Sequence, residues 1–266
     1  MTDFQTLQLD FDPRGFATLW LDRPEKNNAF DAAMIGELIL ALDALKERRE
    51  LRFLVLRGRG RHFCAGADLA WMREAAALDY AANLADVQAL AELMYNLHHL
   101  KLPTLAVVQG AAFGGALGLI ACCDLAIGAV DAQFALSEVR IGLAPAVIGP
   151  FVVQAIGERA ARRYALTGER FDGARARELG LLAECYPAAE LDAALEQWTA
   201  SLLQNGPQAM KATKDLFREV GSGALSSALR RYTESAIARL RISPEGQEGL
   251  RAFLEKRRPA WQEDRS

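Results

Sequence analysis

Glu138 is the one carboxylate in the segment 134–145, whose other residues are mostly apolar. If the fold buries this side chain, its pKa rises and it can exchange protons near neutral pH. Arg140 follows two residues later and offers a competing explanation. An ion pair with Arg140, or a helix cap, would give Glu138 a purely structural role.

Two segments rich in small residues each lead into an expected helix, residues 62–69 and 109–116. Small residues let backbone N–H groups approach a ligand closely, and a helix N-terminus adds positive potential. Two such N–H groups facing one point form an oxyanion hole, where each donor is worth about 3 kcal/mol of transition-state stabilisation. The alternative is that Gly114 and Gly115 only allow tight helix packing.

Other catalytic motifs lack their required residues. Gly58 and Gly60 follow an expected strand, but Phe63 stands where a dinucleotide-binding fingerprint needs its third glycine. The basic residues of the segment 57–62 are therefore interpreted as a solvated loop, with contact to a phosphate as the alternative. P-loop, serine-hydrolase and zincin motifs are also absent from the sequence. His98 and His99 fall at the C-terminal end of an expected helix, where their positive charges interact favourably with the helix dipole. Four cysteines lack metal-ligand or disulfide-framework spacing and are expected to be reduced core residues: Cys64, Cys122, Cys123 and Cys185.

The composition is that of an ordinary globular protein. The 266 residues are 51% hydrophobic and 24% charged. The formal net charge of −3 argues against a broad nucleic-acid footprint, which needs a basic excess. The first residues show no basic segment followed by an apolar run, so no signal peptide is expected and the cytoplasm is the expected location.

The uncharged stretch 104–123 raises a membrane alternative, because roughly 20 such residues can cross a bilayer. Pro103 opens this stretch, Gln109 interrupts it and Asp124 closes it, and no Lys/Arg cluster flanks it. We therefore expect a buried strand over 105–108, a glycine turn and a buried helix, and no contact with membranes.

The pattern of apolar residues predicts an α/β fold. A hairpin over 7–11 and 17–21, with its turn at 13–15, precedes a helix that Asp31 caps. Strands and helices then alternate, which indicates parallel strands with helical crossovers. The expected elements are a strand over 53–56, a helix from about 68, a helix over 84–100, the strand and helix of 105–123, and a strand over 125–127.

Two regions are expected. Residues 1–188 form the α/β core, and residues 189–266 form a helical region that packs on the core and on a neighbouring subunit. Helical patterns in this second region cover 191–203, 207–220, 224–240 and 244–257.

Seven segments in this order resemble the crotonase, or enoyl-CoA hydratase/isomerase, family over nearly the whole chain: 21–30, 63–69, 110–124, 134–138, 166–168, 180–181 and 252–257. The resemblance implies a crotonase-like spiral of β-β-α units and a C-terminal helical trimerisation region. It also implies a homotrimer or homohexamer that acts on acyl-CoA substrates. No cofactor is implied, because the CoA thioester is itself the substrate.

The resemblance also implies the site residues. The backbone N–H groups of Ala67 and Gly115 match those that hold the thioester oxygen, and Glu138 matches the catalytic acid–base. Arg23 and Lys26 match residues near the CoA phosphates, whereas Phe253 and Lys256 match residues that reach a neighbouring subunit's CoA. The full set placed around the substrate is Arg23, Lys26, Ala65, Asp68, Leu69, Gly114, Gly118, Phe253 and Lys256.

One departure bears on the reaction. Hydratases of this family usually carry two glutamates, and the first of them falls on Gly118 here. Single-glutamate members are often isomerases, but the segments 65–72 and 137–146 look most like the methylglutaconyl-CoA and isohexenylglutaconyl-CoA hydratase branch. We therefore expect a hydratase of a branched, carboxylated 2-enoyl-CoA in leucine or acyclic terpene breakdown. An acyl-CoA isomerase and a non-catalytic acyl-CoA binding protein are the alternatives.

Gly118 has two explanations. A glycine there removes a negative charge and opens space for the substrate's carboxylate or an ordered water, with Arg140 or Arg73 as the counter-charge. Alternatively, Gly118 merely continues the small-residue face of a packed helix.

Overall fold

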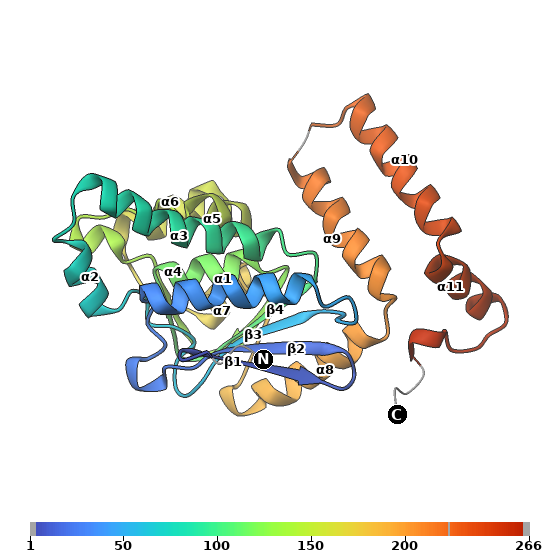
Figure 1. Ribbon diagram of the computed structural model, residues 1–266, viewed down its shortest axis with the longest axis horizontal. Coiled ribbons are helices and arrows are strands. Elements are labelled where there is room, and N and C mark those ends of the chain that lie inside the picture. The colour runs from blue at the N-terminus through green and yellow to red at the C-terminus, as the bar shows by residue number, and fades with distance from the viewer. Residues whose placement is uncertain (1–3, 223, 263–266) are drawn as a thin grey trace.

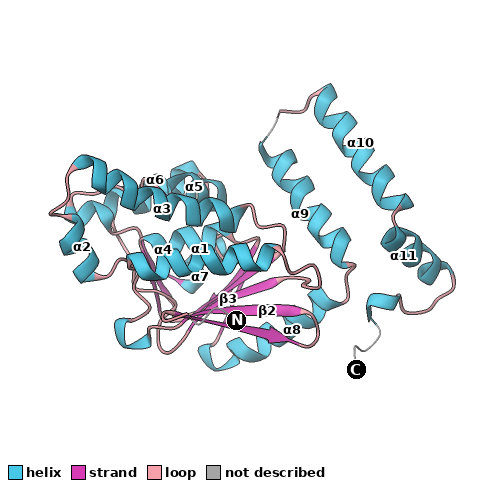
Figure 2. Cartoon of the chain, in the orientation of Figure 1, coloured by secondary structure: helices cyan, strands magenta, loops and turns pink. Residues whose placement is uncertain are grey.

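The computed structural model describes residues 4–222 and 224–262. Its main sheet has six strands in the order β1-β2-β3-β4-β6-β9 (Figures 1 and 2). β1 and β2 form the predicted antiparallel hairpin, and each later neighbour pairs in parallel, as the alternation of strands and helices predicts. The strands are β1 (Leu7–Asp12), β2 (Phe16–Leu21), β3 (Leu54–Gly58), β4 (Thr104–Val108), β6 (Leu125–Ala129) and β9 (Glu184–Tyr186).

Helices cover both faces of this sheet. α1 (Ala32–Lys46), α3 (Tyr80–His98) and α4 (Gly115–Cys122) lie on one face, and α8 (Leu191–Leu203) lies on the other (Figure 1). Asp31 caps α1 as predicted, because its side chain accepts a hydrogen bond of 2.8 Å from the Met34 N–H. All five residues of β4 are buried, which agrees with the strand expected over 105–108.

The uncharged stretch 104–123 forms β4, the short strand β5 (Ala111–Phe113) and α4. Within residues 4–222 and 224–262, no helix combines the length and apolarity that a bilayer crossing requires.

A second, smaller sheet was not predicted. It joins β5 to β7 (Gln133–Ala135) in parallel, and β7 to β8 (Phe171–Asp172). β4 and β6 are each followed by one of these short strands and then by a helix: α4 after β5, and the 3-10 helix η2 (Glu138–Ile141) after β7. β3 is also followed by a pairing with the second sheet and then by a helix, but the pairing is a single bridge. Cys64 makes this parallel bridge to Ala112 before α2 (Leu69–Ala75) begins. The β-β-α units therefore stack side by side.

Three further helices lie between η2 and β9 in the chain. They are α5 (Gly149–Ile156), α6 (Glu158–Thr167) and α7 (Gly173–Glu178). The last helices begin near the predicted positions, α9 (Pro207–Ser222), α10 (Ser227–Ile242) and α11 (Pro244–Leu254). These last three stand beside the core as a separate arm (Figure 1). Buried Lys214 of α9 holds the arm through an ion pair of 2.7 Å with Asp124, at the end of α4.

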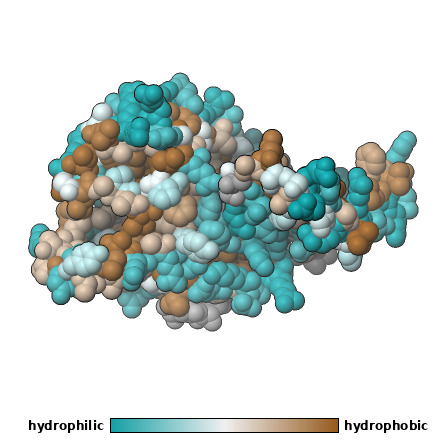
Figure 3. All heavy atoms as spheres, turned by 90° about the horizontal axis from the view of Figure 1, so that it is seen from above, coloured by the Kyte–Doolittle hydropathy of each residue, from teal (hydrophilic) through white to brown (hydrophobic). Residues whose placement is uncertain are grey.

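Exposed apolar side chains gather around α2, the start of α3 and η2. Brown residues are frequent at the corresponding left-hand side of Figure 3. From α2, α3 and the turn between these helices the side chains are Leu69, Leu78, Tyr80, Leu84 and Val87, and from η2 and the loop after it they are Val139, Ile141 and Leu143. We call this set the apolar rim. Such a patch on a water-soluble surface favours contact with an apolar ligand or protein.

Buried Asn28 ties the loop after β2 to the loop after β3. Its Oδ1 accepts a hydrogen bond of 2.9 Å from the Arg23 N–H. Its Nδ2 donates to the carbonyls of Arg59 and His62, at 2.9 and 2.8 Å. Asn27 and Asn28 both have left-handed backbones, with φ of 53° and 55°. Asparagine tolerates this conformation better than most residues do.

These bonds predict a stability difference between two adjacent variants. Asn28→Ala removes the partner of one part-buried N–H, of Arg23, and of two part-buried carbonyls, of Arg59 and His62, whereas exposed Asn27 supplies a control with the same backbone strain. We expect Asn28→Ala to lower the free energy of unfolding by about 2–4 kcal/mol more than Asn27→Ala. Urea denaturation of the two variants measures this difference. Equal losses would contradict the role of the Asn28 side chain.

Candidate active site

The register of the short strands brings Ala67 and Gly115 to the same level. Cys64 pairs with Ala112 in parallel, and Ala67 and Gly115 stand three residues beyond these partners. The Phe113 N–H donates to the Cys64 carbonyl at 3.1 Å, which keeps the two segments together. The two segments singled out by their small residues are therefore neighbours.

Phe30 directs the Ala67 N–H outward. The Phe30 N–H donates to the Gly66 carbonyl at 2.8 Å, and the Phe30 carbonyl accepts from the Asp68 N–H at 2.7 Å. In such a parallel bridge the middle residue, Ala67, points its own N–H and C=O away from the partner strand. Ala67 is exposed, so its N–H group is available to a ligand.

Gly115 supplies the second N–H group. It is the first residue of α4, where a backbone N–H has no acceptor within the helix. A Cβ atom added to Gly115 would lie 3.2 Å from the Phe30 ring, so Phe30 contacts both segments. This arrangement suits two N–H donors that hold one carbonyl oxygen.

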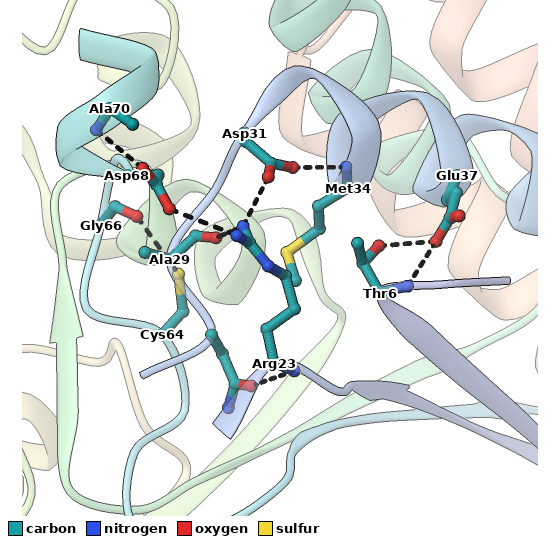
Figure 4. Close-up of polar contacts among 11 residues, drawn as sticks. Thr6, Arg23, Ala29, Asp31, Met34, Glu37, Cys64, Gly66, Asp68 and Ala70 are labelled. Atoms are coloured by element: carbon teal, nitrogen blue, oxygen red, sulfur yellow. Dashed lines mark hydrogen bonds and ion pairs between the residues drawn. The ribbon is translucent and has the colours of Figure 1, made fainter. Parts of the chain in front are cut away.

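Arg23 holds the side chain of Asp68, the residue after Ala67, as Figure 4 shows. Its guanidinium lies 2.7 Å from an Asp31 oxygen and 3.3 Å from an Asp68 oxygen. It also donates to the Ala29 carbonyl at 2.9 Å. The guanidinium of Arg23 is thus paired with protein oxygens, which holds the loops that carry Asp31 and Asp68 together. Its expected place near the CoA phosphates stays a prediction.

Asp68 is fixed from two sides. Its side chain caps α2 by accepting a hydrogen bond of 2.8 Å from the Ala70 N–H. This bond, together with the nearby positive charges of Arg23 and Lys26, holds the pKa of Asp68 below its usual range. Asp68 is buried, whereas Ala65 is half-buried and Lys26 and Leu69 are exposed. A role for these residues in CoA binding stays a prediction.

Glu138 lies against the start of α4. A Cβ atom on Gly114 would stand 3.1 Å from Glu138 Oε1, so a side chain here would crowd the carboxylate. The backbone of Gly114 also has φ of 54°, a conformation that favours glycine. The Oε2 atom is buried and has no hydrogen-bond partner among the residues that the structure describes. Burial raises the pKa of Glu138, and a hydrogen bond from its own backbone N–H opposes this only in part.

The ion pair with Arg140 that the sequence left open is not formed. The Arg140 side chain instead packs on Gly168, where a Cβ atom would lie 2.9 Å from Arg140 Nε. Within residues 4–222 and 224–262, no ion pair reaches Glu138. Glu138 thus combines a raised pKa with a free oxygen, which is the condition for proton exchange near neutral pH.

The open space expected beside Gly118 does not exist. A Cβ atom there would lie 2.3 Å from Ile148 Cγ2 and 3.0 Å from Met94 Sδ. Gly118 is buried in the middle of α4, so it continues the small-residue face of a packed helix. The proposal that it makes room for a substrate carboxylate or a water molecule was wrong.

His62 was also misread from the sequence. It was assigned to a solvated loop, but its Nδ1 accepts a hydrogen bond of 2.9 Å from the Ala111 N–H. Burial, with the positive charge of Arg61, lowers the pKa of His62, which favours the neutral ring that can accept this bond. His62 therefore joins the β3 unit to the β4 unit. The sequence signal for this role was the position of His62 between an expected strand and a segment rich in small residues.

Phe253 lies in the last turn of α11 and Lys256 directly follows this helix, in the arm that stands beside the core (Figure 1). Phe253 is 81% exposed, and Lys256 follows with a left-handed backbone, φ 53°. A separate cavity of about 830 Å³ lies where α9 meets the end of α4, and none of the predicted site residues lines it.

Comparisons with known proteins give the family of the chain. Residues 12–264 match the family model described as enoyl-CoA hydratase/isomerase. An enoyl-CoA hydratase structure from Shewanella pealeana is similar, with 47% identity, a TM-score of 0.93 and 97% of each chain covered.

Two curated relatives carry different activities in their names. The chain is 30% identical to the 2,3-dehydroadipyl-CoA hydratase of Escherichia coli, over 91% of this chain and 92% of the relative. It is 28% identical to the trans-2-decenoyl-acyl-carrier-protein isomerase of Streptococcus mutans, over 97% and 98%. With the family model and the shared fold, these matches show that the chain belongs to the enoyl-CoA hydratase/isomerase, or crotonase, family.

Proposed function

We propose that this protein is a hydratase that adds water across the 2,3 double bond of a branched, carboxylated 2-enoyl-CoA. Substrates of the isohexenylglutaconyl-CoA or 3-methylglutaconyl-CoA type fit this description. The observation that carries the proposal is the unpaired carboxylate of Glu138 at the Gly114–Gly115 start of α4, beside the outward N–H group of Ala67.

The geometry supports the following sequence of steps. Conjugation with the thioester makes C3 of the substrate electrophilic, and a water molecule adds there. Negative charge moves onto the thioester oxygen, where the N–H groups of Ala67 and Gly115 stabilise the enolate. Glu138 accepts the proton of the water and returns a proton to C2. Glu138 thus ends in its starting state, and the product gains one water.

The residues around Glu138 support our proposal that the acyl group is branched and carries a carboxylate. The apolar rim offers contacts for a branched hydrocarbon chain. Exposed Arg140, two residues after Glu138, is the cation that we assign to the substrate's extra carboxylate. The name of the Escherichia coli relative, a dehydroadipyl-CoA hydratase, supports a second carboxylate on the acyl chain.

An isomerase is the second candidate, and the single carboxylate favours it. Moving a double bond needs one group that removes a proton from one carbon and returns it to another, which Glu138 alone can do. The Streptococcus mutans relative is named as an isomerase. Mass spectrometry separates the two activities, because hydration adds the mass of water to the acyl-CoA and isomerisation leaves the mass unchanged.

Glu138→Gln tests the acid–base role. Glutamine nearly preserves the shape of the side chain but cannot exchange a proton, so we expect turnover to fall by about 10²–10⁴-fold. Binding of the CoA ester should be retained. The assay measures hydration of isohexenylglutaconyl-CoA and 3-methylglutaconyl-CoA, with Glu158→Gln on the exposed start of α6 as the control. Unchanged turnover in Glu138→Gln would exclude Glu138 from the mechanism and favour a binding protein.

The pH profile gives an independent readout of the same role. The charged form of Glu138 accepts the proton of water, so kcat/KM should fall as the pH drops through the pKa of Glu138. Because burial raises this pKa, the acid limb should lie above the ordinary glutamate value of 4.5. An acid limb at or below 4.5 would contradict the burial argument.

The arm supports a homotrimeric or homohexameric assembly in which Phe253 and Lys256 complete a neighbour's site. Apolar side chains are exposed on all three of its helices, and Phe217, Ile242 and Phe253 are examples. We expect sedimentation to give three or six copies. Lys256→Ala should leave this assembly intact and raise KM for the CoA ester, whereas Arg241→Ala on α10 should not. A fully active monomer would rule out the shared site.

A further inference from the structure

The side chain of Arg23 joins two segments of the chain that run side by side (Figure 4). In the first segment its Nη1 atom donates to the Ala29 carbonyl at 2.9 Å and lies 2.7 Å from an Asp31 oxygen. In the second segment its Nη2 atom lies 3.3 Å from an Asp68 oxygen. One guanidinium therefore holds three protein oxygens on two segments.

The middle residues of these two segments form the bridge that directs the Ala67 N–H group outward. Phe30 lies between Ala29 and Asp31, and Ala67 directly precedes Asp68. The two hydrogen bonds of the bridge measure 2.8 and 2.7 Å. Because a hydrogen bond to a carbonyl oxygen tolerates a broad range of angles, these two bonds alone allow the Ala67 segment to tilt. The contacts of Arg23 on both sides oppose this tilt.

The backbone of Arg23 is itself fixed in a tight turn. Its N–H group donates to the Oδ1 atom of buried Asn28 at 2.9 Å. Its carbonyl accepts from the N–H groups of Lys26 and Asn28, both at 2.9 Å. The Arg23 side chain is only 15% exposed, so it has little room to change rotamer. The guanidinium therefore ties the position of the Ala67 segment to that of this turn.

We propose that Arg23 is a positioning residue that acts through Ala67, whose N–H group it holds in the orientation that meets a thioester oxygen. The inference rests on the proposed function, in which that N–H group is an oxyanion donor. The role needs the fork of arginine, because separate nitrogen atoms pair with Asp31 and Asp68. Lysine has the same charge but a single nitrogen atom, so charge alone does not replace Arg23.

The carbonyl stretch of a bound thioester measures this role without turnover. Hydrogen bonds to a carbonyl oxygen lower its stretching frequency, so infrared spectra of bound butyryl-CoA, labelled with ¹³C at the carbonyl, report on the two N–H donors. We expect wild type to lower the frequency relative to the free ester. Arg23→Gln and Arg23→Lys should both lose most of this shift.

Arg57→Gln is the matched control for these spectra. Arg57 is 16% exposed and pairs at 2.6 Å with Asp192 of α8, on the other face of the sheet. Its loss also breaks an ion pair between two elements, but it should leave the carbonyl shift at the wild-type value. An equal loss in Arg57→Gln would reduce Arg23 to a general structural role and overturn the proposal.

A thioester without phosphates separates positioning from contact with CoA. Butyryl-pantetheine carries the same acyl group and none of the CoA phosphates. If Arg23 acts through Ala67, Arg23→Gln loses the carbonyl shift with both esters. A loss confined to butyryl-CoA would overturn the proposal and assign Arg23 to the CoA phosphates. A full shift with both esters would overturn it as well.

Asp68→Asn keeps the test decisive if Arg23→Gln does not fold. Asparagine caps a helix as well as aspartate does, so the start of α2 keeps its hydrogen bond to the side chain. The substitution removes the negative charge that pairs with Arg23. We expect Asp68→Asn to lose part of the carbonyl shift. A folded Asp68→Asn variant with the full shift would contradict the proposal.

The catalytic consequence is a lower kcat. A donor that is tilted away from the thioester oxygen stabilises the enolate less, so we expect Arg23→Gln to hydrate 3-methylglutaconyl-CoA with a kcat about 10–100-fold below wild type. An unchanged kcat would overturn the catalytic part. The butyryl esters carry no double bond, so a wild type that shifts their carbonyl but hydrates neither 3-methylglutaconyl-CoA nor isohexenylglutaconyl-CoA contradicts the proposed function alone. A wild type without the shift excludes Ala67 as a donor and overturns this inference too.

Discussion

The parallel register of a few short segments is the constraint on which the site depends. Phe30 pairs with Ala67, Cys64 with Ala112, and β5 with β7. Each pairing uses the N–H and C=O groups on one side of a segment and leaves those on the other side free. A slip of one residue would turn the Ala67 N–H inward. The hydrogen bonds of Asn28 and His62 to neighbouring segments oppose such a slip.

The carboxylates at this site serve two different purposes. Asp31 and Asp68 are paired with Arg23 and cap helices, so their side chains are held in place. Glu138 is half-buried against Gly114, and its buried Oε2 atom has no partner among the described residues, which makes its charged form costly and raises its pKa. The paired groups fix the backbone donors, and the unpaired group remains free to exchange a proton. Separating these tasks lets a rigid loop lie beside a reactive side chain.

The sequence predicted most long elements, because their apolar periods and caps are local signals. Asp31, Pro207 and Pro244 marked helix starts correctly. β5, β7 and β8 have only two or three residues each, too few for a periodic pattern, so the second sheet was missed. Glu138 and the small-residue segments stood out by composition. The contact of Ile148 with Gly118 joins residues from two elements, and no local pattern could indicate it.

The central claim is that one thioester oxygen meets the N–H groups of Ala67 and Gly115 while Glu138 faces the acyl chain. A crystal structure of the protein with an unreactive, saturated acyl-CoA thioester tests it most directly. We expect the thioester oxygen to lie about 2.7–3.1 Å from both nitrogen atoms, with the Glu138 carboxylate beside C2 and C3. A thioester bound elsewhere, for example in the cavity between α9 and the end of α4, would contradict this account.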